Sequence, residues 1–267
     1  MRARPFLATY GPWALVAGGS EGLGAAFAQV LAGRGVDLVL VARRPGPLAA
    51  TAERLRQATR VQVRTVTADL AASGAIDLIA EATADIEVGL VVANAAISPI
   101  GSFTAITEAD IGAVADLNCR ATALLARRFL PPMVQRGRGG LILMSSLAGL
   151  QGVPGLAVYS ASKAFLNTLA QALWAENRSS GVDVIACCAG AVTTPGYQQA
   201  ARRSAPGATI PEQVAVTTLD ALGSGFRVVP GPLNKVSTFT LERMLPKRAA
   251  IAIFGRASAA TLHETTG

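Results

Sequence analysis

The chain has 267 residues, of which 51% are hydrophobic and 15% are charged, and it carries a formal net charge of +7. This composition excludes an intrinsically disordered chain, which combines low hydrophobicity with a high density of charge. Its one histidine, His263, and its three cysteines, Cys119, Cys187 and Cys188, exclude a disulfide framework and any metal site that needs two histidines, and they argue strongly against a Ser-His-Asp hydrolase.

Apolar, β-branched runs alternate with helical segments along the chain. In chain order the pattern predicts a strand at Trp13–Ala17, a helix at Gly22–Ala32, a strand at Leu38–Val41, a helix at Leu48–Ala58, a strand at Val61–Val66, a helix at Ala75–Ala84, a strand at Leu90–Ala93, a helix from Ala109 to Arg128 that extends towards Gln135, a strand at Gly140–Met144, a helix at Val158–Asn177, a strand at Val182–Cys187, a helix at Pro211–Leu222 and a strand at Phe226–Val229. Because alternating strands and helices build βαβ units, the sequence predicts an α/β fold: a Rossmann-like, doubly wound parallel sheet of about seven strands with helices on both faces.

No internal repeat and no long Gly/Ser linker divides the chain, so residues 1–267 are predicted to form one domain with a frayed tail at 258–267. No apolar stretch of about 18 residues is free of charge, Gly and Pro, which argues against a transmembrane helix. The expectation is a cytoplasmic protein without membrane insertion. Of the 24 basic residues all but three are Arg, and they are scattered singly or in pairs. This scatter argues against a nucleic-acid partner and favours small anionic molecules.

A glycine-rich turn follows the first predicted strand. Gly18, Gly22 and Gly24 lie between that strand and the next helix. Glycine lacks a Cβ, so the backbone can turn tightly and approach a pyrophosphate at the helix N-terminus. A lone glycine pattern indicates only a turn, but the strand before it and the helix after it are what a dinucleotide-binding site requires.

The second predicted strand is followed by Arg43 and Arg44. A site that prefers NAD places an acidic residue here to accept from the ribose 2′-hydroxyl, whereas an arginine accommodates the 2′-phosphate of NADP. The sequence therefore predicts NADP(H) as the cofactor. Glu21 in the glycine turn is less typical of that preference.

Tyr159 and Lys163 are four positions apart on a predicted helix, so their side chains lie on one face. A nearby ammonium lowers the pKa of a phenol from its usual ~10, which lets a tyrosine act as a general acid or base. Ser146 lies 13 residues before Tyr159, at the end of an apolar strand, with Ser145 as the competing hydroxyl. A Tyr-x3-Lys pair alone would indicate only an amphipathic surface, and the added serine favours a catalytic group.

Over roughly residues 12 to 195 these motifs resemble the short-chain dehydrogenase/reductase family, in its form with a Tyr-x3-Lys motif. The resemblance implies an NADP(H)-dependent oxidoreductase that transfers hydride between the nicotinamide and the carbonyl carbon of a small-molecule ketone, aldehyde or alcohol. It implies four catalytic residues: Asn118, Ser146, Tyr159 and Lys163. Tyr159 would exchange the proton, Ser146 would hold the substrate oxygen, Lys163 would lower the pKa of Tyr159 and bind the nicotinamide ribose, and Asn118 would hold a water in a proton relay.

The resemblance also implies the cofactor contacts. Asp69 would lie near the adenine amine, Val192 would contact the nicotinamide carboxamide, and Thr194 would contact the carboxamide or the diphosphate. The implied set is Gly18, Ser20, Gly22, Leu23, Gly24, Arg43, Arg44, Asp69, Leu70, Asn94, Ala95, Tyr159, Lys163, Gly190, Val192 and Thr194. Alanine stands at positions 17, 93, 96 and 189, where the family usually has Thr, Asn, Gly and Pro.

The segment 195–212 corresponds to the substrate lid of the family. The candidate substrate contacts are Ser146, Leu147, Val153, Ala191 and Tyr197. Most of these positions are apolar, which suits a lipophilic substrate. The stretch from Tyr10 to Val16 resembles members related to 17β-hydroxysteroid dehydrogenases and long-chain 3-oxoacyl reductases.

By the same resemblance the chain is expected to form a homodimer or homotetramer through the long helices at about 109–135 and 158–177. The apolar stretch Ala121–Ala126 suits such a contact, or equally the face of its own sheet. Two alternatives stand beside the enzyme: a non-catalytic dinucleotide-binding sensor or scaffold, and an epimerase or dehydratase. The complete catalytic set argues against the first, and the chain length and glycine spacing argue against the second.

Overall fold

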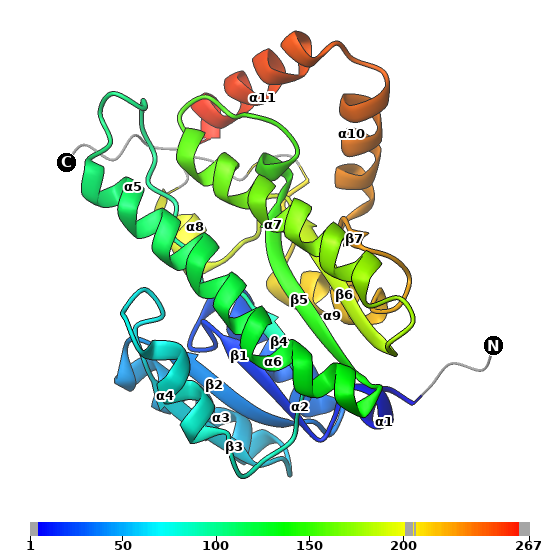
Figure 1. The fold of residues 1–267 in the computed structure, drawn as a ribbon. Coiled ribbons are helices and arrows are strands. Elements are labelled where there is room, and N and C mark those ends of the chain that lie inside the picture. Colours follow the sequence, from blue (N-terminus) through cyan, green and yellow to red (C-terminus); the bar gives the residue numbers. More distant parts are fainter. Residues whose placement is uncertain (1–4, 201–204, 206, 262–267) are drawn as a thin grey trace.

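The molecule is built around a seven-stranded sheet whose strand order is β3-β2-β1-β4-β5-β6-β7, with every neighbouring pair parallel. A computed structural model describes residues 5–200, 205 and 207–261 of the chain. Figure 1 shows the sheet behind the long helices of residues 122–136 and 157–176. The strands are β1 Trp13–Ala17, β2 Asp37–Ala42, β3 Val63–Thr67, β4 Val88–Ala93, β5 Gly139–Ser146, β6 Val182–Ala189 and β7 Arg227–Val228. The predicted Rossmann-like doubly wound sheet is confirmed.

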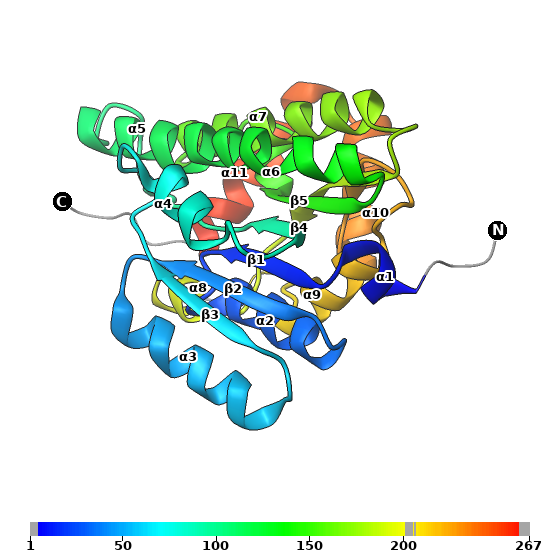
Figure 2. The same ribbon diagram turned by 60° about the horizontal axis from the view of Figure 1, so that its bottom comes forward.

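Helices cover both faces of the sheet (Figure 2). They are α1 Phe6–Tyr10, α2 Gly22–Gly33, α3 Pro45–Ala58, α4 Ala75–Ala82, α5 Glu108–Val114, the π-helix η1 Ala115–Ala121, α6 Thr122–Arg136, the 3-10 turn η2 Leu147–Gly149, α7 Ala157–Glu176, α8 Pro195–Ala200, α9 Pro211–Asp220, α10 Pro232–Arg243 and α11 Lys247–Thr261. In the described residues no helix has both the length and the apolar character that crossing a bilayer requires.

The core consists of two hydrophobic layers, one on each face of the sheet. Alternate residues of a strand point to opposite faces, so Ala14 and Val16 of β1 join one layer while Leu15 and Ala17 join the other. The first layer packs under α2, α3 and α9, and the second under α4, α6 and α7. Burial on both faces explains why the strands are continuously apolar rather than alternating.

The predicted long helix at 109–135 is continuous in the structure from Glu108 to Arg136, but it contains η1 in its middle. A π-helical turn accommodates an extra residue within a helix and is frequent at functional sites. Three side chains of the stretch Ala121–Ala126 are buried in the second layer: Ala121, Leu125 and Ala126. This stretch therefore packs mainly on its own sheet, because those three positions lie on the inward face of the helix.

Two C-terminal helices, α10 and α11, were not predicted. The reason is an inverted pattern: in α10 the buried side chains are polar, Asn234 and Thr238, whereas Leu233, Val236 and Phe239 are exposed. Hydrophobic periodicity identifies a helix only when the apolar face is the buried one. The short α1 and the π-helical geometry of η1 also escaped prediction.

The predicted tail and lid lie partly outside the described residues. Helix α11 continues to Thr261, so residues 258–261 of the expected tail are helical, while 262–267, with His263, lie outside the described residues. The segment 195–212, the expected lid, contains α8 and the first turn of α9. Residues 201–204 and 206 of that segment lie outside the described residues as well.

Candidate functional site

The candidate cofactor site lies where the strand order reverses. The chain winds from β1 to β3 in one direction and then crosses over to β4 on the other side of β1. Ligands of open α/β sheets bind at this crevice, outside the carboxyl ends of the strands. The backbone N–H groups of Asn94 and Ala95 donate to the carbonyl of Ala17, at 3.1 and 2.9 Å, which fixes the two loops that flank the crevice.

The glycine turn depends on two close approaches. Gly18 has φ +80°, in the left-handed region that favours glycine, and its carbonyl accepts from the Asn94 side chain at 3.2 Å. A Cβ placed on Gly24 would lie 1.9 Å from that same carbonyl oxygen, so only glycine fits at this position. The absent side chain lets α2 begin directly beneath the turn.

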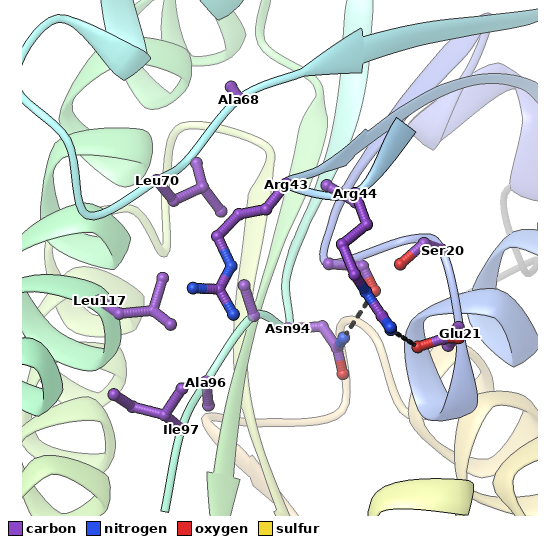
Figure 3. A pocket seen from close by; sticks show the side chains of 13 residues that line it. Ser20, Glu21, Arg43, Arg44, Ala68, Leu70, Asn94, Ala96, Ile97 and Leu117 are labelled. Atoms are coloured by element: carbon purple, nitrogen blue, oxygen red, sulfur yellow. Dashed lines mark hydrogen bonds and ion pairs between the residues drawn. The ribbon is translucent and has the colours of Figure 1, made fainter. Parts of the chain in front are cut away.

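A cavity of about 290 Å³ opens beside this turn (Figure 3). Its lining residues are Gly18, Ser20, Glu21, Ala42, Arg43, Arg44, Ala68, Leu70, Asn94, Ala95, Ala96, Ile97 and Leu117. They come from the ends of β1, β2 and β4, the loop after β3, and η1. Apolar walls with a few charged groups are typical of a site for an aromatic ring that carries a charged substituent.

The two arginines after β2 differ in their partners. Figure 3 shows the side chain of Arg43 extending into the cavity, and within the described residues it makes no hydrogen bond or ion pair. Arg44 instead forms an ion pair with Glu21 of the glycine turn. The Arg44 charge is therefore largely offset, whereas Arg43 presents an uncompensated guanidinium to a ligand.

Several predicted cofactor residues lie outside this cavity. The Asp69 carboxylate is exposed and accepts from the Ala71 N–H at 3.1 Å, while its neighbour Leu70 lines the wall. A Cβ on Gly190 would lie 2.9 Å from the Asn234 side chain, so this glycine packs against α10. The other predicted residues outside the lining are Gly22, Leu23, Gly24, Tyr159, Lys163, Val192 and Thr194.

Some lining residues were not assigned as cofactor contacts from the sequence: Glu21, Ala42, Ala68, Ala96, Ile97 and Leu117. Leu117 comes from η1, far from the strand ends in the sequence, and its adjacency to the predicted Asn118 was the one available signal. The ion pair between Glu21 and Arg44 joins residues 23 positions apart, and no spacing rule in the sequence foretells it.

The structure brings Ser146 and Tyr159 together at the end of β5. Ser146 is the last residue of β5, its hydroxyl accepts from the Ala148 N–H at 3.2 Å, and it lies close enough to the phenol of Tyr159 on α7 to lower the pKa of that group. The competing Ser145 points elsewhere: its hydroxyl donates to the Lys163 carbonyl at 2.8 Å. Of the two serines, only Ser146 contacts the phenol.

Lys163 is buried one helical turn beyond Tyr159. Its ammonium donates to the Met144 carbonyl at 2.7 Å and lies 5.4 Å from the centre of the Tyr159 ring. Burial removes water from the charged form and lowers the pKa of Lys163 to about 8. Burial also raises the pKa of Tyr159, although the hydrogen bond with Ser146 opposes this shift. The direction is opposite to the one expected from a neighbouring ammonium, because desolvation of the phenol dominates.

Asn118 is fully buried in η1 and all its bonds are to protein groups. Its amide donates to the Ile97 carbonyl at 2.9 Å and to the Ser162 hydroxyl at 3.0 Å, and its oxygen accepts from the Ile97 N–H at 3.0 Å. Ser162 in turn donates to the carbonyl of Tyr159 at 2.7 Å. The side chain thus joins the loop after β4 to α7.

The predicted substrate contacts differ in exposure. Leu147 and Val153 are buried, while Ser146, Ala191 and Tyr197 are partly exposed. The Tyr197 hydroxyl accepts from the Ala205 N–H at 3.0 Å, so this bond joins α8 to a residue later in segment 195–212. At its base, the Thr209 N–H donates to the Ala191 carbonyl at 2.9 Å.

A family model described as short chain dehydrogenase matches residues 12–205. A 7beta-hydroxysteroid dehydrogenase of Clostridium sardiniense is 30% identical over 233 residues, which cover 86% of this chain and 89% of that protein. A very-long-chain 3-oxoacyl-CoA reductase of Mus musculus is 33% identical over 178 residues. The match covers 65% of this chain but only 57% of the length of that reductase.

Solved structures give the same similarity. One from work on 7beta-hydroxysteroid dehydrogenase stereoselectivity superposes with a TM-score of 0.88 and 25% identity, covering 94% of this chain and 100% of that chain. A short-chain dehydrogenase from Sphingobium yanoikuyae in complex with NADPH superposes with a TM-score of 0.76 and 27% identity, covering 93% and 94% of the two chains.

The close approach at Gly24 predicts the effect of adding one methyl group. Gly24→Ala forces the new Cβ against the Gly18 carbonyl, so we expect a loss of about 3 kcal/mol of unfolding free energy and of dinucleotide binding. Gly33→Ala, at the end of the same helix with nothing within 4 Å, is the matched control and should be neutral or stabilising by up to ~1 kcal/mol. Denaturant unfolding checks both, and equal stabilities of the two variants would contradict the steric argument.

The lowered pKa of Lys163 predicts a pH effect on stability. Between about pH 8 and its ordinary value the unfolded chain binds more protons at this group than the folded chain, so the unfolding free energy should rise with pH. We expect wild type to gain stability relative to Lys163→Met between pH 8 and 10, measured by urea unfolding. Because Cys119 and Cys187 interact with the Lys163 charge, both proteins carry Cys119→Ala and Cys187→Ala, and the contributions of Tyr159 and Cys188 are then common to both. The exposed Lys235→Met should show no such slope, and parallel curves for Lys163→Met would refute the lowered pKa.

Proposed function

Since the chain belongs to the short-chain dehydrogenase family, oxidoreductases that bind a nicotinamide dinucleotide and act on hydroxyl and carbonyl groups, we propose that it is an NADP(H)-dependent reductase or dehydrogenase of a lipophilic ketone, aldehyde or alcohol. The observation that carries this proposal is the meeting of Ser146 and Tyr159 at the carboxyl edge of the sheet, with the Lys163 ammonium 5.4 Å from the phenol ring. This group lies at the same edge of the sheet as the glycine turn.

The residues of the cavity fit a dinucleotide. The glycine turn lines one side of the cavity with Gly18, Ser20 and Glu21, and α2 begins directly after it, where a helix N-terminus leaves backbone N–H groups unpaired. Leu70, Ile97 and Leu117 provide an apolar wall for a base, and Arg43 provides a cation without another partner. An arginine after the second strand suits the 2′-phosphate of NADP, and a structural neighbour is complexed with NADPH. These features together favour NADP(H) over NAD(H).

Bound NADPH supplies the hydride that reduces the carbonyl carbon. The protein's own contribution is the proton: Tyr159, kept protonated by the raised pKa, donates it to the oxygen that gains negative charge. The Ser146 hydroxyl, which lies beside the phenol, holds that oxygen within reach. Lys163 lies behind the phenol and offers a second proton store, since its lowered pKa makes the ammonium easier to deprotonate.

The substrate class follows from apolar contacts and from one relative. Leu147 and Val153 lie on the segment that follows Ser146, and both are apolar. A relative whose match covers 86% of this chain is named for a hydroxysteroid, a rigid lipophilic alcohol. We therefore propose a steroid-sized ketone or secondary alcohol as the first compound to assay.

Replacing Tyr159 tests the reaction. Tyr159→Phe removes only the hydroxyl that exchanges the proton, so turnover should fall by at least about a hundredfold while NADPH binding stays. Tyr10→Phe is the matched control, because Tyr10 bonds to Asp183 away from the candidate site, and should keep turnover. Undiminished turnover in Tyr159→Phe would reject the mechanism. NADPH binding without turnover of any carbonyl compound would favour the sensor or scaffold alternative.

Replacing each arginine tests the cofactor preference. Arg43→Ala should weaken NADPH binding tenfold or more, the loss of about one charge-assisted hydrogen bond, and leave NADH binding unchanged. Arg44→Ala should have a smaller effect, because Glu21 already engages that guanidinium. Fluorescence titration with both dinucleotides measures these effects. A wild type that binds NADH more tightly than NADPH would overturn the assignment.

A further inference from the structure

Asn167 lies one turn beyond Lys163 on α7, and none of the functions above uses it. Tyr159, Lys163 and Asn167 are spaced by four residues, which places them along one face of the helix. Asn167 is 7% exposed, and its amide donates to the Gly149 carbonyl at 3.1 Å. That carbonyl ends η2, the turn that begins directly after Ser146.

The orientation of the Asn167 amide is fixed from the other side by Cys188 of β6. The Cys188 thiol donates to the Asn167 oxygen at 3.1 Å. A carbonyl can only accept and a protonated thiol can donate, so the amide nitrogen must face Gly149. Burial raises the pKa of Cys188 to about 12, which keeps the thiol protonated at neutral pH. One side chain therefore joins α7, η2 and β6.

Asn167 holds the turn η2, and this turn supports the Ser146 hydroxyl. Within η2, the Ala148 N–H donates to Ser146 at 3.2 Å, one residue before Gly149. A Cβ on Gly149 would lie 2.6 Å from the carbonyl carbon of Lys163, so the turn rests directly on the α7 backbone. A small shift of η2 would consequently change the distance between the hydroxyls of Ser146 and Tyr159.

We propose that Asn167 is a positioning residue, which by holding the Gly149 carbonyl sets the position of the Ser146 hydroxyl beside Tyr159. The inference rests on the proposed oxidoreductase function for its catalytic meaning, but the geometry it predicts exists without substrate. Without the amide, the Gly149 carbonyl loses its side-chain donor and the turn is free to move from α7. The interaction of Ser146 with the phenol should then weaken.

The first readout is the titration of Tyr159 itself. The hydrogen bond with Ser146 lowers the pKa of Tyr159, so weakening it should raise that pKa. Absorbance of the phenolate, taken as the difference between each protein and its Tyr159→Phe counterpart, isolates this group from the other tyrosines. We expect a midpoint at least half a pH unit higher in Asn167→Ala than in wild type. The titratable neighbours Lys163, Cys119 and Cys187 are unchanged by the substitution.

The matched control is Asn177→Ala. Asn177 directly follows α7 and is also 7% exposed, but its amide donates to the Leu173 carbonyl in the last turn of that helix. It should leave the Tyr159 midpoint unchanged whatever its effect on stability. In turnover assays Asn167→Ala should lower kcat at least fivefold with KM for NADPH within twofold, whereas Asn177→Ala should leave kcat unchanged. Equal Tyr159 midpoints in the two variants would overturn the proposal.

Cys188 gives a second test that keeps Asn167 in place. Cys188→Ala removes the donor that orients the amide and should shift the Tyr159 midpoint in the same direction by a smaller amount. Cys188→Ser restores a donor and should return the midpoint to the wild-type value. An unchanged Tyr159 midpoint in Cys188→Ala would contradict the proposed orientation of the amide. If Asn167→Ala does not fold, the Cys188→Ala titration decides the question. If wild type reduces no carbonyl compound, the proposed function fails, yet the titration still tests the positioning.

Discussion

Parallel pairing of β1 with β2 on one side and with β4 on the other is the constraint on which the candidate site depends. Because all strands point the same way, every loop that follows a strand emerges at one edge of the sheet. The chain reverses its winding direction at β1, so the loops after β1 and β4 diverge and leave a crevice between them. The glycine turn, the arginines after β2 and the serine after β5 all reach this edge through the same geometry. A change of register in β1 would displace each of them.

Around Tyr159 and Lys163, burial opposes the ionisation of the two side chains. Lys163 is 3% exposed and Tyr159 is partly buried, and the loss of water disfavours the charged form of each: it lowers the pKa of the lysine and raises that of the tyrosine. The cost of burying Lys163 is reduced by the Met144 carbonyl, which accepts from the ammonium at the end of β5. The strand that carries Ser146 therefore also holds the lysine. This shared support explains why the two groups remain close although they are 17 positions apart in the sequence.

The sequence predicted those parts of the molecule whose pattern follows from burial. Continuous apolar strands between helices indicated the sheet, and the strand-turn-helix setting of Gly18 to Gly24 indicated the crevice. The sequence could not predict η1, because a π-helical turn has no distinct apolar period. It could not predict the ion pair between Glu21 and Arg44 either, because each side chain alone indicates only a solvent-exposed charge. The direction of the Tyr159 pKa shift was also beyond it, because desolvation depends on the whole packing around the phenol. Residue spacing predicts which face of a helix a side chain occupies, but it does not predict how deeply that side chain is buried.

Helix α10, which the sequence did not predict, holds the C-terminal part of segment 195–212 in place. Its buried Asn234 donates to the carbonyls of Gly207 and Pro230, at 3.1 and 3.0 Å, and packs against Gly190 at the end of β6. The segment 195–212 is thus tied at its C-terminal part to a helix that lies outside the matched family region of residues 12–205. Hydrogen bonds from an asparagine need no apolar stripe, so neither the periodicity nor the family motifs reveal them. The candidate site is built on the predictable core, while the helix that anchors segment 195–212 lies in the C-terminal part of the chain.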